Sequence, residues 1–293
     1  MRRVIRRSDR EWPVSLDELH PHDPPSHLFA DGLALDPDAV RVAVVGTRRP
    51  TYSGLEVAAR ISRGLAEAGF AVVSGMAVGI DAAAHRAALE AGGTTVAVLG
   101  CGLDVDYPAR NAKLKSAIAE DGTLLTEYAD GTPPLKHYFP LRNRIIAGLS
   151  VGVVVVEGTI RSGALVTARL ALDCNRNVYA VPGSARNPMA EGPNELIRRG
   201  QAALVTGVEH VLEDLAPSIV WRDRSATEAA PDLDAVEAAV LETLDDAPVP
   251  PDALAARFEL KPGRLAAALA ALEVRGLARR GPGGYVRGVN LHS

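Results

Sequence analysis

The stretch VGVVVVEGTIRSGALVTARLALD, residues 151–173, decides the fold class. Its first six residues form an uninterrupted apolar run, which is typical of a strand that is buried on both faces. A short loop with two glycines follows, and a helix is expected from about Ser162 to Asp173. A strand, a loop and a helix in this order are the repeating unit of a parallel α/β sheet.

The same unit recurs elsewhere in the chain. Further strands are predicted at 42–45, 70–73, 95–99 and 178–181. Helices are predicted from Ser53, at the capping box Ser53-Gly54-Leu55-Glu56, to about Gly69, and from about Ile80 to Ala91. Hydrophobic residues make up 47% of the 293 residues but aromatic residues only 4%, so the core is built mainly from Val, Leu, Ile and Ala. We therefore expect a mostly parallel sheet with helices on both faces.

Regions of different composition flank this pattern. Residues 1–40 are rich in Pro, His and Asp, and we expect an irregular lead-in that packs on the main domain, residues 41–215. Residues 216–234 have the composition of a linker. Residues 235–293 predict three helices and a glycine-tipped hairpin, the outline of a winged helix. Their seven basic and seven acidic side chains cancel, so a protein-contact module is favoured at least as much as a DNA reader.

Composition excludes several classes of protein. The net charge of -4 argues against a generic basic coat for nucleic acid, so that any phosphate site must be a local patch. Cys101 and Cys174 lie far apart and lack metal-ligand spacing, which favours a reducing cytoplasm over a disulfide framework or a zinc site. No apolar run approaches the ~20 residues that span a bilayer. The dinucleotide fingerprint is absent, and no cofactor is expected.

Two strand-end loops are candidates for phosphate binding, because ligands of parallel sheets lie beyond the carboxyl ends of the strands. The first contains Gly46, Thr47 and Arg48, followed by Arg49. The second contains Ser74, Gly75 and Gly79, whose glycines allow close backbone approach. In the helix after it, Asp81 and His85 have the spacing of an acid/base pair, but a helix-terminal carboxylate and a packed histidine are the favoured interpretation.

The segment PLKHYFPLRNR, residues 134–144, is a basic island in an acidic chain. Lys136 and Phe139 combine a charge with an aromatic face, which is how proteins hold single-stranded nucleic acid without reading its sequence. We place Arg142-Asn143-Arg144 on a loop where a helix begins. Its arginines either contact phosphate or brace the pocket by pairing with carboxylates such as Glu157.

The loop of the opening stretch is the last candidate. Ser162, Gly163 and Thr167 offer small donors at a helix N-terminus, where a phosphate would lie. Glu157 is the acid of this loop, and it is a candidate sugar-hydroxyl acceptor or catalytic carboxylate.

The segments VAVVGTRRPTYSG, VVSGMAVGIDAAAH, FPLRNRIIAGLS, VEGTIRSGALVTARLA and AVPGS occur in this order, and together they resemble the DNA-processing protein A family, also called DprA or Smf. The resemblance runs from about Pro13 to Leu215 and extends to the winged helix. It does not include the helical, SAM-like domain that begins many members. It implies an extended Rossmann-like fold, and a non-enzymatic protein that binds single-stranded DNA, forms a homodimer and loads the recombinase RecA during natural transformation.

The resemblance also assigns residues to the DNA site. The family's pocket arginine corresponds to Arg48, and its basic and aromatic contacts correspond to Lys136 and Phe139. Two alternatives to a DNA-binding mediator remain. One is a nucleotide-cleaving phosphoribohydrolase with Glu157 acting on a ribose, against which the Gly-Gly-x-Gly-Thr-x-x-Glu signature is absent. The other is a nucleotide sensor with the winged helix as its output.

Overall fold

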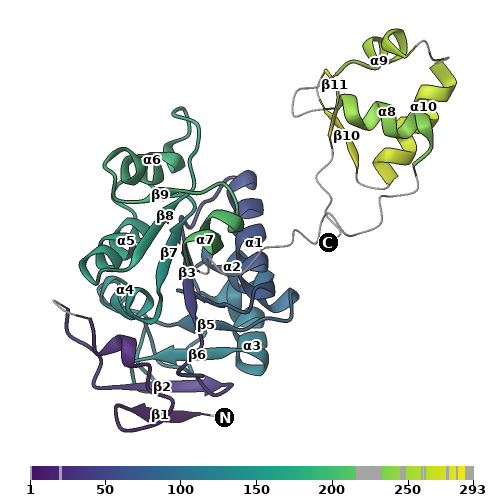
Figure 1. Ribbon diagram of the computed structural model, residues 1–293. Helices are drawn as coiled ribbons and strands as arrows, with labels where there is room; N and C mark the ends of the chain where they lie inside the picture. The colour runs from purple at the N-terminus through teal and green to yellow at the C-terminus, as the bar shows by residue number, and fades with distance from the viewer. Residues whose placement is uncertain are drawn as a thin grey trace. The chain divides into compact units, whose positions relative to one another are not determined.

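The computed structural model describes residues 2–19, 22–215, 233–244, 249–258, 260, 262–274, 277–281 and 283–287. The chain divides into two compact units, Met1–Ile219 and Val220–Ser293 (Figure 1). Within the described ranges, no helix is long and apolar enough to cross a membrane.

The first unit is built on a nine-stranded sheet with the order β1-β2-β6-β5-β4-β3-β7-β8-β9. The strands are β1 (Arg3–Arg6), β2 (His27–Gly32), β3 (Arg41–Val45), β4 (Ala71–Ser74), β5 (Thr95–Val98), β6 (Thr123–Thr126), β7 (Gly152–Val155), β8 (Asn177–Ala180) and β9 (Ala203–Leu204). Neighbouring strands from β6 to β9 pair in parallel, whereas β1 and β2 are antiparallel additions at one edge. The mostly parallel sheet predicted from the sequence is confirmed.

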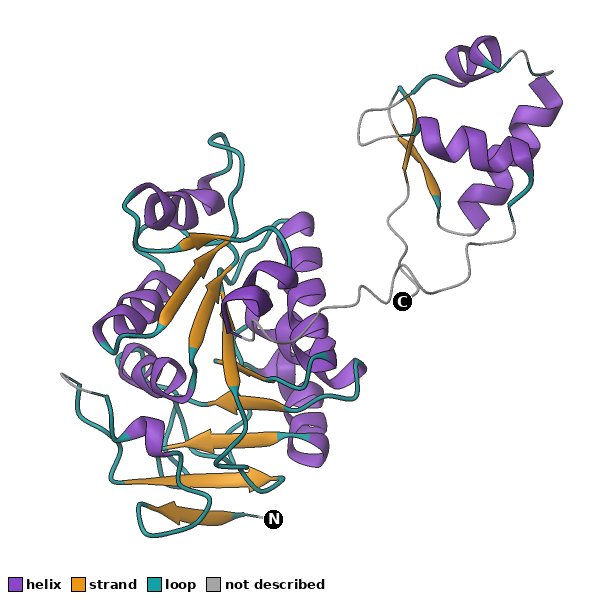
Figure 2. Cartoon of the chain, viewed as in Figure 1, coloured by secondary structure: helices purple, strands orange, loops and turns teal. Residues whose placement is uncertain are grey.

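Helices cover both faces of this sheet (Figure 2). They are α1 (Tyr52–Glu67), α2 (Ile80–Glu90), α3 (Ala112–Asp121), α4 (Tyr138–Leu149), α5 (Gly163–Asp173), α6 (Glu191–Arg198) and α7 (Val208–Leu215). Helix α4 packs against α5, and α2 packs against α1 and α3. The larger hydrophobic cluster joins the buried strands to residues of α4 and α5, which bury Ile145, Ile146 and Leu165.

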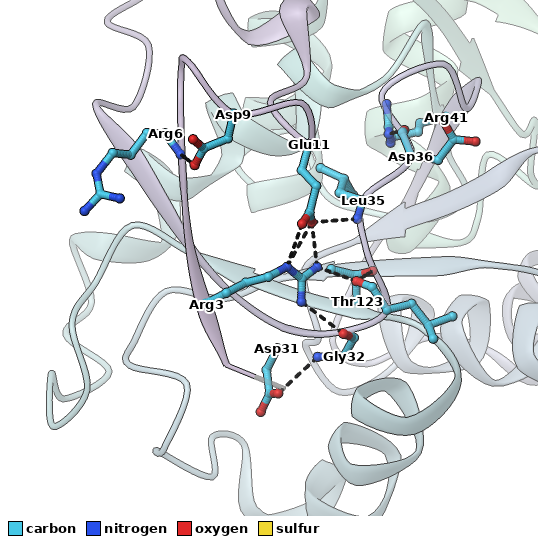
Figure 3. Close-up of polar contacts among 11 residues, drawn as sticks. Arg3, Arg6, Asp9, Glu11, Asp31, Gly32, Leu35, Asp36, Arg41 and Thr123 are labelled. Atoms are coloured by element: carbon cyan, nitrogen blue, oxygen red, sulfur yellow. Dashed lines mark hydrogen bonds and ion pairs between the residues drawn. The ribbon is translucent and has the colours of Figure 1, made fainter.

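The N-terminal segment differs from the irregular lead-in that we expected. Within residues 1–40, β1 and β2 extend the sheet, and Ile5 and Leu28 are fully buried in its core. The Arg3 guanidinium pairs with the Glu11 carboxylate at 2.8 Å, and Glu11 also accepts the amide N–H of Leu35 (Figure 3). The expected packing on the main domain is present, since Trp12, Leu16 and Leu19 lie in the main cluster.

Helix α1 begins differently from the capping box predicted at Ser53. Its N-cap is Thr51, whose hydroxyl oxygen accepts the amide N–H of Gly54. The acid that completes the cap comes from a distant loop. The Glu157 carboxylate accepts the Thr51 amide N–H at 2.8 Å and the Thr51 hydroxyl at 2.7 Å. This contact fixes the loop after β3 against the loop after β7.

The sheet has a topological switch point between β3 and β7. From β3 the chain moves outward through β4, β5 and β6, and then returns to place β7 on the other side of β3. The connections leave these two central strands in opposite directions, so a crevice opens beyond their carboxyl ends. The strand order alone therefore locates the region where a ligand is expected.

The second unit has the predicted winged-helix elements. Helices α8 (Ala235–Thr243), α9 (Pro251–Arg257) and α10 (Pro262–Val274) accompany the antiparallel strands β10 (Ala278–Gly281) and β11 (Gly284–Arg287). A core of Val240, Leu254, Leu269 and Leu272 joins the helices. Asp234 and Glu237 form a capping box at the start of α8. Most of the predicted linker, residues 216–232, lies outside the described residues.

Candidate functional site

A cleft of about 700 Å³ lies at the switch point, beyond the carboxyl ends of β3 and β7. The loop after β3 contributes Gly46, Thr47 and Arg48. Helix α4 and the residues before it contribute Lys136, Phe139, Arg142 and Asn143, and the start of α5 contributes Ser162, Gly163 and Thr167. The structure therefore brings three segments that are far apart in the sequence into one site.

The exposed side of the cleft, which we call the rim, consists of Arg48, Lys136, Phe139 and Tyr107. The Arg48 guanidinium carbon lies 5.5 Å from the centroid of the Phe139 ring. The Tyr107 ring lies 5.4 Å from Phe139 at an interplanar angle of 33°. Arg48 and Lys136 are exposed, and within the described parts of the chain neither forms an ion pair. The rim thus offers unneutralised cations beside aromatic faces.

The inner side of the cleft includes the buried residues Asp81 and Arg142, which together with the buried His85 we call the polar layer. Arg142 is only 4% exposed, and its guanidinium donates to the carbonyl oxygens of Gly75, at 2.8 Å, and Val98. Burial lowers the pKa of Arg142 to about 10, and the Asp81 carboxylate opposes that shift. Arg142 therefore keeps its charge at neutral pH, while its hydrogen bonds hold α4 against β4 and β5.

The contacts of Asp81 and His85 confirm that they are a helix-terminal carboxylate and a packed histidine, as favoured from the sequence, and not an acid/base pair. Asp81 accepts the amide N–H groups of Gly75 and Ala77, and burial raises its pKa. His85 Nδ1 lies 2.7 Å from the Thr95 hydroxyl, which itself donates to the Val72 carbonyl. Nδ1 is therefore the protonated nitrogen of a neutral ring. Burial lowers the pKa of His85 to about 3.

Ser74, Gly75 and Gly79 do not line the cleft but stabilise the loops and strands that form it. The Ser74 hydroxyl donates to the Val44 carbonyl and ties β4 to β3. A Cβ on Gly75 would lie 2.7 Å from the Arg142 guanidinium. Gly79 has a φ of +91°, and a Cβ there would lie 2.5 Å from the Thr47 carbonyl oxygen. These glycines are needed because the loops after β3 and β4 approach the buried arginine and each other closely.

Arg142-Asn143-Arg144 is not a loop as we expected, because these residues lie within helix α4. The Asn143 side-chain amide donates to the Gly163 carbonyl and links α4 to the start of α5. Arg144 pairs with Glu127 at 2.5 Å, so the predicted bracing by a carboxylate is present but Glu157 is not the partner. The three residues hold the cleft together, and Arg144 does not line it.

The Glu157 carboxylate is occupied by hydrogen bonds within the protein, which disfavours its candidate roles as a catalytic carboxylate and a sugar-hydroxyl acceptor. It is 7% exposed, and besides its two bonds from Thr51 it accepts the Asn187 side-chain amide at 3.2 Å. Both carboxylate oxygens are therefore engaged. Among the described residues there is also no cluster of three or more His, Cys, Asp or Glu side chains that suits a metal ion.

Helix α5 begins at the cleft with its N-terminus facing the site. Ser162 is the N-cap, and its hydroxyl oxygen accepts the amide N–H of Leu165. The Thr167 hydroxyl donates to the Gly163 carbonyl, so it is used within the helix. The amide groups of the first turn and the helix dipole make this end of the cleft favourable for an anion.

Tyr107 is a rim residue that the sequence analysis missed. It is 38% exposed and lines the cleft beside Phe139. It follows β5 by several residues, in a loop for which the sequence analysis named no candidate. The rule that ligands lie beyond strand ends could have identified it, had the rule been extended through the whole loop.

The switch point, the helix N-terminus and the cationic, aromatic rim define a Rossmann-like protein with an anion-binding cleft. The chain belongs to the DNA recombination-mediator protein A family, whose model matches residues 3–216. A model of the DprA winged helix domain matches residues 224–284.

Curated relatives agree with this membership. Protein Smf of Escherichia coli is 40% identical over 271 residues, which are 90% of this chain and 72% of that protein. The DNA processing protein DprA of Streptococcus pneumoniae is 44% identical over 203 residues, which are 69% of this chain and 71% of that protein.

Solved structures are similar as well. The X-ray structure of the Streptococcus pneumoniae DprA matches with a TM-score of 0.69 and 43% identity, over 72% of this chain and 74% of that one. DNA processing protein A from Helicobacter pylori matches with a TM-score of 0.67 and 31% identity, over 74% of this chain and 97% of that one. That protein has a described single-stranded DNA binding mode.

Proposed function

We propose that this protein binds single-stranded DNA in the cleft at the switch point, without catalysing a reaction on it. The observation that carries the proposal is the stack of Arg48 on Phe139 beside Tyr107. Cations neutralise phosphates and aromatic faces stack on bases, and the two together bind single strands with little dependence on sequence. The resemblance to a DNA-binding relative from Helicobacter pylori supports the same conclusion.

The hydrogen bonds that engage the two candidate carboxylates, Glu157 and Asp81, support a binding role over nucleotide cleavage. The carboxylate that a phosphoribohydrolase would need corresponds to Glu157, and this group is held by Thr51 and Asn187. Asp81, which does line the cleft, is buried and accepts backbone N–H groups near Arg142. Neither carboxylate is placed to take a proton from a ligand.

We further propose that the bound strand is passed to a RecA-type recombinase in the cytoplasm during DNA uptake, and that the protein acts as a homodimer. Family membership supports these roles. Sedimentation of the full-length protein tests the dimer. Recombinase filament formation on single strands, followed with and without the protein, tests the loading role. A monomer at micromolar concentration, or unchanged filament formation, would remove the respective part of the proposal.

The central test measures binding of a fluorescent oligothymidine and of mononucleotides over a salt series. We expect affinity for the oligonucleotide to fall steeply with salt, because each contacted phosphate of a single strand contributes a slope of about -0.7. Arg48→Ala should weaken binding and make the slope shallower. Arg169→Ala is the matched control, since Arg169 is an exposed arginine of α5 outside the cleft. Turnover of a nucleotide, or tighter binding of a mononucleotide, would overturn the proposal.

A further inference from the structure

Three exposed arginines lie along the β7–β8 side of the cleft. Arg49 follows Arg48 in the loop after β3, Arg161 precedes the cap of α5, and Arg186 lies in the loop after β8. Within the described residues, none of the three forms an ion pair. We call them the arginine track.

The loops that carry the track are fastened together by one buried carboxylate. Glu157 binds Thr51 of the first loop and Asn187 of the third, and Asn187 directly follows Arg186. Main-chain bonds add to this contact. The Thr47 amide donates to the Glu157 carbonyl at 2.7 Å, and the Gly158 amide donates to the Met189 carbonyl at 2.6 Å. The bases of the three loops are therefore held in fixed positions relative to one another.

The charge on this side of the cleft is almost purely positive. Residues 46–51, 157–163 and 181–190 contain one acid, the buried Glu157. On the opposite side, the segment from β5 into α3 carries the exposed cations Arg110 and Lys113 but also the exposed acids Asp104 and Asp106. A polyanion that extends beyond the cleft is thus attracted more strongly toward β8 than toward β5.

We propose that a single strand longer than the cleft leaves it over the arginine track, with its flanking phosphates on Arg49, Arg161 and Arg186. This inference rests on the proposed function, because it extends the same DNA site. It assigns Arg161 and Arg186 a role that the strand-end motifs alone do not give them. Arg49 also lines the cleft, whereas Arg161 and Arg186 add phosphate contacts only for strands that extend beyond it, so the contribution of the track depends on oligonucleotide length.

The test compares a triple variant, Arg49→Gln with Arg161→Gln and Arg186→Gln, with the wild-type protein. Oligothymidines of roughly four and about fifteen nucleotides serve as short and long probes, within the range of typical single-strand sites. For the long probe, we expect binding weakened about ten-fold or more at moderate salt, and a salt slope shallower by about 2, from three lost contacts at about 0.7 each. For the short probe, affinity should fall much less, because of the three arginines only Arg49 lines the cleft itself.

The matched control is Arg110→Gln with Lys113→Gln, which removes exposed cations from the opposite side of the cleft. The inference would be overturned if the control variant bound the long probe more weakly than wild type while the triple variant bound it as tightly as wild type. That result would place the strand's exit on the β5 side of the cleft. Equal loss for short and long probes in the triple variant would also overturn it. In either case wild-type binding of the long probe leaves the proposed function intact, whereas no wild-type binding would remove both.

Discussion

The polar layer and the rim contain similar side chains in opposite settings. In the polar layer, the Arg142 guanidinium is buried and donates to two carbonyl oxygens. At the rim, the Arg48 guanidinium is exposed and stacks on a ring. Both arginines line the cleft and both belong to its sequence motifs. The difference teaches that a basic motif mixes residues that build a site with residues that are free to contact a ligand.

The largest expected effect comes from removing the charge of the polar layer. Arg142→Met removes the donor to the buried carbonyl oxygens of Gly75 and Val98, and each buried polar group left unsatisfied typically costs about 1–3 kcal/mol. The free energy of unfolding, measured by urea denaturation, should fall by about that amount for each of the two groups. Arg48→Met is the matched change at the rim, and its effect should stay within about 0.5 kcal/mol. Equal losses in the free energy of unfolding for the two substitutions would contradict the distinction between a structural Arg142 and a ligand-contacting Arg48.

A change at the rim should act on binding and leave stability nearly unaltered. Phe139→Leu keeps an apolar side chain against Gly100 but removes the aromatic face. Stacking of one base contributes about 1–3 kcal/mol, so we expect affinity for an oligothymidine to fall roughly 5- to 150-fold. Fluorescence anisotropy measures the affinity, and thermal denaturation checks the stability. Undiminished affinity would show that Phe139 does not contact bases.

The polar layer also predicts a dependence of stability on pH. The folded-state pKa of His85 is lowered to about 3, whereas the unfolded histidine titrates near 6.5. Its contribution is complete above about pH 6.5 and is lost as the pH falls toward 3, by about 1.4 kcal/mol for each unit, because only the unfolded state takes up the proton. Denaturation series at about pH 7 and pH 5 should show a steeper loss for wild type than for His85→Gln. Parallel losses would contradict a neutral buried His85.

The smallest expected effect comes from the contact between Thr51 and Glu157, which fixes the loop that carries Arg48. Thr51→Ala removes the cap of α1 and one of the bonds to Glu157. Loss of such a cap costs about 1 kcal/mol. Thr243→Ala is a control on another helix, since the Thr243 hydroxyl only donates back to the Ala239 carbonyl. Urea denaturation of both variants measures the loss in free energy of unfolding. An equal loss in the two variants would mean that the Thr51 cap contributes no more than an ordinary hydroxyl within a helix.

The central strands were predictable from the sequence because they are buried on both faces and appear as continuous apolar runs. Strands β1 and β2 were missed because each is short and half-buried, and because prolines surround them. The prediction of a capping box at Ser53 was wrong for a different reason. The acid that completes the cap of Thr51 is Glu157, which lies 106 residues away in the sequence, and local spacing carries no trace of it.

The candidate site was predictable in its loops but not in the roles of its residues. The rule of strand ends selected Gly46, Arg48 and Ser162, which do meet at the cleft. Burial of Arg142 gave no local signal, since a lone arginine is ordinarily placed at the surface. The partner of Arg144 was also hidden, because Glu127 becomes its neighbour only through the pairing of β6 with β5.

The position of β2 has a consequence for how the chain is made. Strand β2 completes its pairing only with β6, whose residues leave the ribosome about 90 positions later. At a synthesis rate of about 5–20 residues per second, the first strands wait for several seconds with an unpaired edge. An unpaired edge can add a foreign strand. The arginines at both ends of β1, Arg3 and Arg6, place charge along the other edge of this strand pair, which β1 forms, and this discourages pairing between nascent chains there.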